Sequence, residues 1–242
     1  MNGVLELAGV SRSFRGGAGV SDLALRVEPG EIVALVGLNG AGKTTLMRLA
    51  LGMLRPDRGT VTIDGASLQR LPGRVWARVG HLVEVPLAYR ELTVRQNLAL
   101  TARLHAAGPD RVGVALATWH LGDLADRRVG RLSLGNRQRV GLAGALQHHP
   151  ELIILDEPSN SLDPAAVLVL RDELRRHSDR GAAVLVSSHH LDEVSRIADR
   201  IVLMNAGRLI GDLDPAGQDL ERAFFARIHA DDQQRRAEGD HR

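Results

Sequence analysis

The chain of 242 residues contains no cysteine and only six aromatic residues of the Phe, Trp and Tyr type. The absence of cysteine excludes disulfides, iron–sulfur clusters and thiolate zinc sites. Six scattered aromatic side chains are too few for a base-stacking platform. No run of about 20 apolar residues occurs, and Glu6 precedes any apolar run at the start. We therefore expect a soluble, intracellular protein without a signal peptide or membrane span.

The net positive charge is also small, because 31 basic and 29 acidic residues leave a net charge of +2. Binding of nucleic acid through charge needs clustered positive side chains, so we expect no nucleic-acid partner. Lysine is nearly absent, and Lys43 is the only one in the chain. Every other basic residue is an arginine. A single lysine can be an accident of composition bias, or its position can require an ammonium group. The residues around Lys43 favour the second interpretation, a position that requires an ammonium group.

The order of apolar runs and turn signals predicts strands that alternate with helices. We expect helices at 43–51, 164–176 and 190–198 and a helical block over 93–147. Strands are expected at 4–10, 23–27, 32–36, 60–63, 152–155, 182–186, 201–204 and 208–210. This order predicts an α/β fold with a mostly parallel sheet and a helical insertion. Residues 231–242 are nearly all polar or charged, and we expect them to be disordered.

The segment between the expected strand 32–36 and helix 43–51 fits the P-loop pattern of phosphate-binding proteins. Glycines let the backbone wrap around phosphates, and the helix N-terminus adds partial positive charge. Lys43 would reach the β and γ phosphates, and the Thr44 hydroxyl would ligate Mg²⁺. The alternative, a Gly-rich turn without a ligand, is disfavoured by the strand before it and the helix after it. The candidate nucleotide-binding residues are Gly37, Leu38, Asn39, Gly40, Ala41, Gly42, Lys43, Thr44 and Thr45.

Two carboxylates follow the apolar strand 152–155, at the position where open α/β sheets bind ligands. Asp156 would belong to the Mg²⁺ shell, and Glu157 would orient and activate the attacking water. A strand that ends in an acidic turn is common by itself, but it is improbable as a coincidence beside a P-loop. Guanine-reading GTPases need an Asn-Lys-x-Asp segment, which a chain whose only lysine is Lys43 cannot contain.

The segment 131–139 identifies the kind of P-loop protein. It reads Arg-Leu-Ser-Leu-Gly-Asn-Arg-Gln-Arg and resembles the Leu-Ser-Gly-Gly-Gln signature of ABC (ATP-binding cassette) transporter ATPases. Leu132, Ser133 and Gly135 match, whereas Leu134 and Asn136 depart from it. A serine hydroxyl and free N–H groups at a helix start form a second anion site. The resemblance extends over essentially the whole chain, and in the family this segment caps the γ-phosphate held by a partner subunit.

Further matches follow the order of the family's motifs. Asp163 resembles the acid of the dimer-contacting D-loop, and His189 resembles the switch histidine that contacts the γ-phosphate. Its neighbour His190 is the weaker candidate. Phe14 lies where the family places an aromatic ring against adenine, although a Phe near a strand end is more often a core residue. Glu84 stands where the family usually has a Gln that ligates Mg²⁺, and a carboxylate can also serve a hard cation.

Together, Glu84 and the leucine of the signature make the chain similar to ATPases of peptide-antibiotic and drug exporters. The resemblance implies a RecA-like core (1–83 and 148–220), an antiparallel β subdomain and a helical subdomain (84–147), all within 1–230. It implies MgATP hydrolysis by a homodimer or a heterodimer with a homologous chain. The partner would be an integral membrane permease, at the cytoplasmic face of the membrane. The alternatives are a soluble non-transport ABC-type ATPase and a regulatory ATP-binding subunit.

Overall fold

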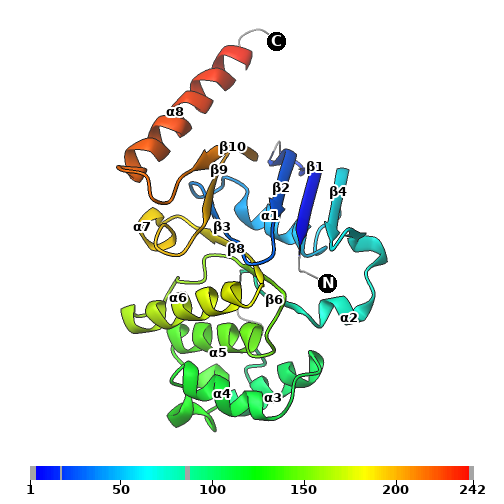
Figure 1. Ribbon diagram of the computed structural model, residues 1–242, viewed down its shortest axis with the longest axis vertical. Coiled ribbons are helices and arrows are strands. Elements are labelled where there is room, and N and C mark those ends of the chain that lie inside the picture. Colours follow the sequence, from blue (N-terminus) through cyan, green and yellow to red (C-terminus); the bar gives the residue numbers. More distant parts are fainter. Residues whose placement is uncertain (1–3, 17, 85–87, 240–242) are drawn as a thin grey trace.

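The computed structural model describes residues 4–16, 18–84 and 88–239. The expected boundaries that fall on 1–3, 17, 85–87 and 240–242 lie outside the described residues. In the described part, ten strands form two sheets, and Figure 1 shows them in the middle of the view, between one long helix at the top and a layer of helices at the bottom. The strands are β1 (Leu5–Ser13), β2 (Gly19–Val27), β3 (Ile32–Val36), β4 (Arg58–Ile63), β5 (Ala66–Ser67), β6 (Val79–Leu82), β7 (Leu152–Leu155), β8 (Ala183–Ser188), β9 (Arg200–Asn205) and β10 (Arg208–Leu213).

The larger sheet has the strand order β10-β9-β3-β8-β7-β6. Its five strands from β9 to β6 pair in parallel, and β10 joins β9 antiparallel at the edge. The smaller sheet, β2-β1-β4-β5, is antiparallel throughout. The expected combination of a mostly parallel sheet and an antiparallel β subdomain is confirmed.

Both faces of the parallel sheet are covered, which explains why its strands are continuous apolar runs. In β3, Ile32, Ala34 and Val36 belong to a core shared with the helices α5 (Leu134–Leu146) and α6 (Pro164–Asp179). The alternate residues Val33 and Leu35 belong to a second core that includes residues of α1 (Lys43–Ala50) and of the antiparallel sheet. All five residues are at most 1% exposed. The period-2 alternation of a strand thus distributes one short segment between two cores.

A helical layer lies between β6 and β7 in the sequence and forms the lower part of the molecule in Figure 1. It agrees with the expected helical insertion. A capping box, in which the side chains of Thr93 and Gln96 each accept from the other's backbone N–H, starts its first helix, α3. The helices of the described chain are α1 (Lys43–Ala50), α2 (Gly73–Trp76), α3 (Val94–Leu104), α4 (Asp110–Thr118), α5 (Leu134–Leu146), α6 (Pro164–Asp179), α7 (Leu191–Val194) and α8 (Leu220–Gly239).

Two sequence predictions are wrong. The helix expected over 190–198 is only the four-residue α7. The expectation of disorder from residue 231 fails over 231–239, which continue the helix α8. Phe224 and Ile228 of α8 are buried in the core, and the Asn205 side chain donates to Asp231 and Asp232 at 2.8 and 2.9 Å. These contacts fix the polar continuation of the helix, which composition alone did not reveal.

Candidate functional site

A cavity of about 250 Å³ lies where β3 ends and α1 begins. It is lined by Asn39, Gly40, Ala41, Gly42, Lys43, Thr44, Thr45, Asp156 and Glu157. Gly42 caps α1 with φ of 108°, a left-handed conformation that side chains with a Cβ rarely adopt. The first amides of a helix lack partners within it, and the helix dipole adds positive potential there. The backbone therefore presents an anion-binding surface to this cavity.

Lys43 is folded into the same cavity and is only 7% exposed. Its Nζ donates to the Gly37 carbonyl oxygen at 2.7 Å and lies 3.3 Å from Oε1 of Glu157. A buried ammonium needs such partners, because desolvation penalises an unpaired charge. The P-loop carbonyl and the carboxylate hold the only lysine at the centre of the phosphate cradle. Leu38, by contrast, is 45% exposed and is not among the residues that line the cavity in the described chain.

Asp156 joins three elements at the carboxyl edge of the sheet. One carboxylate oxygen accepts from the Thr44 hydroxyl at 2.6 Å, and the other accepts from the Ser187 hydroxyl at 2.5 Å. Thr44 belongs to α1, Asp156 follows β7, and Ser187 lies near the end of β8. Asp156 is 8% exposed, and these two hydroxyls set the orientation of its carboxylate. A hydroxyl and a carboxylate at this distance are suitable oxygen ligands for Mg²⁺.

Glu157 lies beside Asp156 and bridges the side chains of Lys43 and His189. Its Oε1 lies near Lys43, and its Oε2 lies 2.7 Å from Nδ1 of His189. The backbone N–H of Glu157 donates to the Ser187 hydroxyl at 2.8 Å. The residue has φ of 46°, a strained left-handed conformation of the kind that clusters at functional sites. The sequence-predicted base and switch histidine are therefore in direct contact.

The signature residues lie elsewhere on the surface. Ser133 caps α5, since its hydroxyl accepts from the Asn136 backbone N–H at 3.3 Å. A Cβ on Gly135 would lie 2.5 Å from the Ser161 carbonyl oxygen, so only glycine permits this close approach. In the described part of the chain, none of Ser133, Gly135 and Asn136 lines the P-loop cavity. This arrangement agrees with the expectation that the segment serves the site of another subunit.

Asp163 connects the signature helix to the segment after Glu157. Its carboxylate caps α6 by accepting from the Ala166 backbone N–H at 2.8 Å, and it also pairs with Arg139 of α5. The Ala166 hydrogen bond, followed by the charge of Arg139, lowers the pKa of Asp163. The aspartate is thus held ionised at the start of α6, in contact with the helix that carries the signature.

Phe14 and Glu84, which were predicted to contact adenine and Mg²⁺, are also not among the residues that line the cavity in the described chain. Phe14 directly follows β1 and is 37% exposed, with the Arg12 guanidinium 5.5 Å from its ring centroid. Glu84 has φ of 69° and pairs with Arg48 of α1. The adenine-stacking role of Phe14 and the Mg²⁺-ligand role of Glu84 stay predictions.

Two residues with structural roles at the site were missed by the sequence analysis. Ser187 links Asp156 to Glu157, and its signal was a hydroxyl at the end of an otherwise apolar strand. Gln138 of α5 is 7% exposed, and its side-chain amide donates to the Pro158 carbonyl oxygen at 3.0 Å. It ties the signature helix to the turn after the carboxylates. A buried glutamine cannot be recognised from sequence alone.

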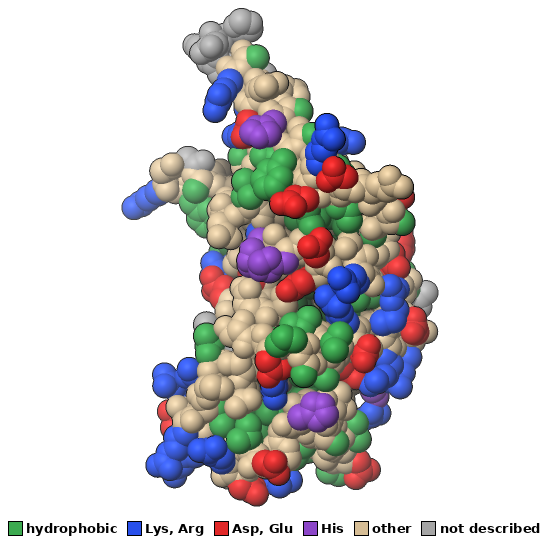
Figure 2. Space-filling model, turned by 90° about the vertical axis from the view of Figure 1, so that its left-hand side faces the viewer, with side chains coloured by type: hydrophobic (Ala, Val, Ile, Leu, Met, Phe, Trp, Pro, Cys, Tyr) green, Lys and Arg blue, Asp and Glu red, His purple; other side chains and the backbone are tan. Residues whose placement is uncertain are grey.

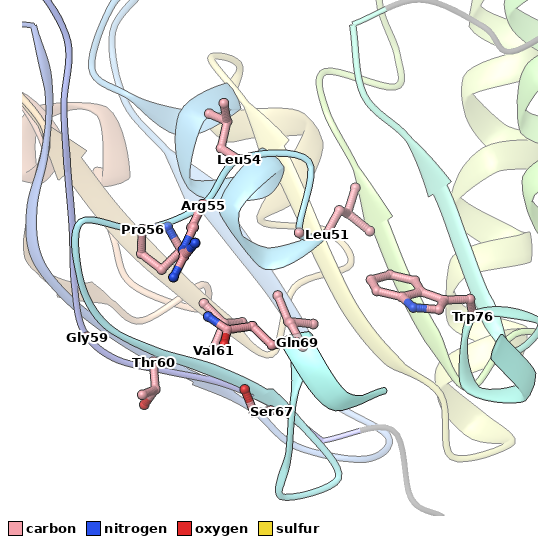
Figure 3. A pocket seen from close by; sticks show the side chains of 12 residues that line it. Leu51, Leu54, Arg55, Pro56, Gly59, Thr60, Val61, Ser67, Gln69 and Trp76 are labelled. Atoms are coloured by element: carbon pink, nitrogen blue, oxygen red, sulfur yellow. The ribbon is translucent and has the colours of Figure 1, made fainter. Parts of the chain in front are cut away.

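A larger cavity, of about 450 Å³, opens at the other end of α1 (Figure 3). Trp76 lies at one end of it, and Arg55 and Pro56 lie at the other. The eight-residue α1 is about 12 Å long and separates this cavity from the P-loop. In the described chain, no residue of the nucleotide-binding motifs lines this larger cavity.

The donor set fits a nucleoside triphosphate with its metal ion. The P-loop amides and Lys43 offer hydrogen bonds and positive charge to phosphates. Thr44 and Asp156 offer two oxygen ligands, and Mg²⁺ is commonly held by one or two carboxylates together with substrate phosphates. The residues present therefore match the expected ligand.

A sequence model of the family described as "ABC transporter" matches residues 20–160. The chain belongs to the ABC transporter family. Over 216 residues it is 38% identical to the SkfA peptide export ATP-binding protein SkfE of Bacillus subtilis, which covers 87% of this chain and 89% of the relative. It is 34% identical over 219 residues to the bacitracin transport ATP-binding protein BcrA of Bacillus licheniformis, with 88% and 70% covered. The expected likeness to ATPases of peptide-antibiotic exporters is confirmed.

Solved structures of ABC cassettes have the same fold. The structure described as the ATP-binding subunit of an ABC transporter superposes with a TM-score of 0.82 at 30% identity, covering 93% of this chain and 94% of that one. The dimeric cassette MJ0796, in a post-hydrolysis state bound to ADP and Pi, gives a TM-score of 0.81 at 22% identity and covers 88% and 99%. The chain is an ATP-binding cassette with the ATPase architecture of the family.

The surface of the cassette agrees with its charge balance. Figure 2 shows acidic and basic side chains interspersed over the face in view. Within the described residues, no helix combines the length and apolar character that a membrane crossing requires. Membership of a transporter family implies that the cassette acts with a membrane partner.

Proposed function

We propose that the chain hydrolyses MgATP to ADP and phosphate and thereby powers a separately encoded membrane permease of the exporter type. The observation that carries the proposal is the position of the Glu157 carboxylate between Lys43 and His189. It lies at the carboxyl edge of the parallel sheet, beside the P-loop. The relatives named for peptide export and bacitracin transport support an export role.

In this proposal the P-loop amides and Lys43 bind the phosphates of ATP, and Phe14 stacks against adenine without reading its base edges. Thr44 and Asp156 hold the Mg²⁺, assisted by Glu84. When bound, Mg²⁺ neutralises charge on the β and γ phosphates. Because the Ser187 hydroxyl also contacts Asp156, the carboxylate keeps its orientation in the absence of a ligand.

Glu157 acts as the general base. It accepts a proton from the attacking water while the oxygen of that water bonds to the γ-phosphorus and the bond to the β–γ bridging oxygen breaks. His189 donates to Oε2 through Nδ1–H, which orients the carboxylate. The Lys43 ammonium stabilises negative charge on the phosphate oxygens. Loss of the base typically costs a factor of about 10²–10⁴ in rate.

We further propose that the active form is a head-to-tail dimer at the cytoplasmic face of the membrane, with either a second copy or a homologous chain. Ser133, Gly135 and Asn136 of one subunit would close the nucleotide site of the other. The position of these residues outside their own P-loop cavity supports this arrangement. Asp163 would contact the partner subunit next to the signature helix.

Glu157→Gln tests the proposal, because it keeps the shape of the side chain and removes the base. Phosphate release should fall by about 10²–10⁴-fold, and light scattering should show an ATP-dependent dimer that ADP does not support. Glu221→Gln on the distant α8 is the matched control. Unimpaired turnover in Glu157→Gln would overturn the catalytic assignment. Failure of a polytopic membrane protein to copurify with the native chain would favour a non-transport ATPase.

A further inference from the structure

A cavity of about 150 Å³ lies between α4, the end of α5 and the second half of α6. It is at the opposite edge of the sheet from the nucleotide site. His149 and Arg180 precede β7 and β8, whereas Glu157 and His189 follow those same strands. A four-residue strand spans about 13 Å, so the two sites are separate. The residues that line the cavity between α4, α5 and α6 include Arg111, Trp119, His149, Glu173, Arg176 and Arg180.

His149 is in contact with two guanidinium groups. Nη1 of Arg111 contacts its Nε2, and Nη1 of Arg180 lies 3.3 Å from its Nδ1. Burial, followed by the charges of Arg111, Arg180 and Arg176, lowers the pKa of His149, so the ring is neutral at pH 7. A neutral imidazole accepts through only one nitrogen. One of the two guanidinium groups therefore faces the ring N–H of His149. Both of these groups are hydrogen-bond donors, and neither can accept from the other.

Positive charge exceeds negative charge around the cavity. Arg111, Arg176 and Arg180 contribute three guanidinium groups, and Glu173 contributes a carboxyl that pairs with Arg176. Neither Arg111 nor Arg180 forms an ion pair with a carboxylate in the part of the chain that the structure describes. Burial raises the pKa of Glu173, while the charges of Arg176 and Arg180 act in the opposite direction. Two arginines thus converge at His149 without a direct ion pair of their own.

We propose that this cavity binds a small phosphate-type oxyanion, either free or as a phosphomonoester. An oxyanion has acceptors only, so it could receive N–H bonds from both guanidinium groups and from the His149 ring. Guanidinium forks match the oxygens of phosphate in geometry as well as in charge. The volume equals about five water molecules at roughly 30 Å³ each, which suits one phosphoryl group and is too small for a nucleotide.

The bound anion would connect two parts of the fold. Arg111 comes from α4 of the helical insertion, whereas Arg180 follows α6 and enters β8 of the core. An anion held by both arginines adds hydrogen bonds across this boundary. Since it binds the folded chain and not the unfolded one, it should raise the melting temperature. The proposal does not depend on the ATPase assignment.

Trp119 provides a probe inside the cavity. It lines the cavity and is 2% exposed, and the chain has two tryptophans in all. Trp76→Phe leaves Trp119 as the only tryptophan, which is excited selectively at the red edge of its absorption band, and Lys43→Ala weakens phosphate binding at the P-loop. In this parent variant, inorganic phosphate should produce a saturable change in Trp119 fluorescence and broaden the ³¹P resonance. A parallel titration with glycerol phosphate distinguishes free phosphate from a phosphomonoester, since the physiological form should bind more tightly.

Arg111→Gln/Arg180→Gln should weaken phosphate binding by about 10- to 100-fold for each arginine removed, because each loses a hydrogen bond to a charged group. Arg74→Gln/Arg103→Gln removes the same charge from exposed positions outside the cavity and should retain the parent affinity. Equal affinity in the two double variants would overturn the proposal. So would the absence of saturable binding in the parent by both fluorescence and ³¹P resonance.

A lysine double variant addresses the case in which the glutamine variant lacks the native circular dichroism. Arg111→Lys/Arg180→Lys keeps both charges and loses both forks. It should bind phosphate at least about tenfold more weakly than the parent. Parent-like affinity in this variant would overturn the oxyanion site, and reduced affinity would support it.

Discussion

Nδ1 of His189 lies 2.7 Å from Oε2 of Glu157, although 32 positions separate the two residues in the chain. Parallel pairing of β7 with β8 brings them together, because Glu157 and His189 both lie beyond the carboxyl ends of these strands. The backbone N–H of His189 also lies 3.3 Å from the same carboxylate oxygen. The histidine therefore orients the glutamate through both its ring and its backbone.

His189→Ala should lower ATP hydrolysis by about 10- to 100-fold, because it removes a hydrogen bond to a charged group. ATP binding should change little, since Lys43 and the P-loop remain. Phosphate release and nucleotide affinity, measured on the same sample, check the two statements. His190→Ala is the comparison variant, because its ring packs 3.8 Å from that of His189 but makes no hydrogen bond to Glu157 among the described contacts. Equal losses in both variants would contradict the assignment of His189.

Glu84→Gln should retain hydrolysis if this residue ligates Mg²⁺, because the amide oxygen replaces the carboxylate. Glu84→Ala should raise the Mg²⁺ concentration needed for half-maximal activity or uncouple transport. The ion pair with Arg48 allows a sharper test, since Arg48→Ala frees the carboxylate without removing it. The Mg²⁺ requirement should then stay at or below that of the native chain. An unchanged requirement in Glu84→Ala, with transport intact, would show that Glu84 has no role with the metal.

Gly135→Ala should destabilise the chain and impair hydrolysis, because the new Cβ would lie 2.5 Å from the Ser161 carbonyl oxygen. Either the signature loop or the segment before Asp163 must move. Overpacking of this kind typically costs about 1–3 kcal/mol. Denaturant unfolding and phosphate release measure both effects. Gly113→Ala, inside α4 with open space around its Cβ position, should stabilise the chain by about 0.5–1 kcal/mol. The opposite order of stabilities would be inconsistent with the packing.

The chain should lose stability as the pH falls from about 6.5 toward 4. Burial, followed by the neighbouring His105, lowers the pKa of His148 to about 3, and burial followed by His149 lowers that of His177 to about 4. The unfolded chain binds protons at these sites below about pH 6.5, whereas the folded chain does not. Each histidine thus removes up to about 1.4 kcal/mol per pH unit from the free energy of unfolding.

Urea unfolding at a series of pH values measures this slope. His177→Gln should reduce this slope by the contribution of about one proton, because the variant has one fewer buried neutral ring. His229→Gln on the exposed side of α8 serves as the comparison. If the two variants reduce the slope equally, burial of His177 is not the cause of the acid sensitivity.

The nucleotide site could be predicted from the sequence because its parts are local. The P-loop is a continuous segment whose glycines, single lysine and threonine act through the adjacent helix N-terminus. Asp156 and Glu157 were recognised because an apolar strand precedes them. The parallel sheet followed from fully apolar runs such as 152–155, which need both faces covered. Periodicity along the chain contains this information without any knowledge of distant contacts.

Tertiary structure alone decided how these segments meet. The Ser187 hydroxyl donates to Asp156 and accepts from the Glu157 backbone N–H, and both bonds join different elements. The pairing of Glu84 with Arg48 likewise depends on a contact between distant segments. The continuation of α8 past residue 231 is held by hydrogen bonds from Asn205, which lies on the strand β9. Arg111 and Arg180, 69 positions apart, meet at His149 only because the fold brings α4 and the residue after α6 to the same cavity. Local sequence specifies which residues a segment offers, but burial and packing between distant segments determine which of them face each other.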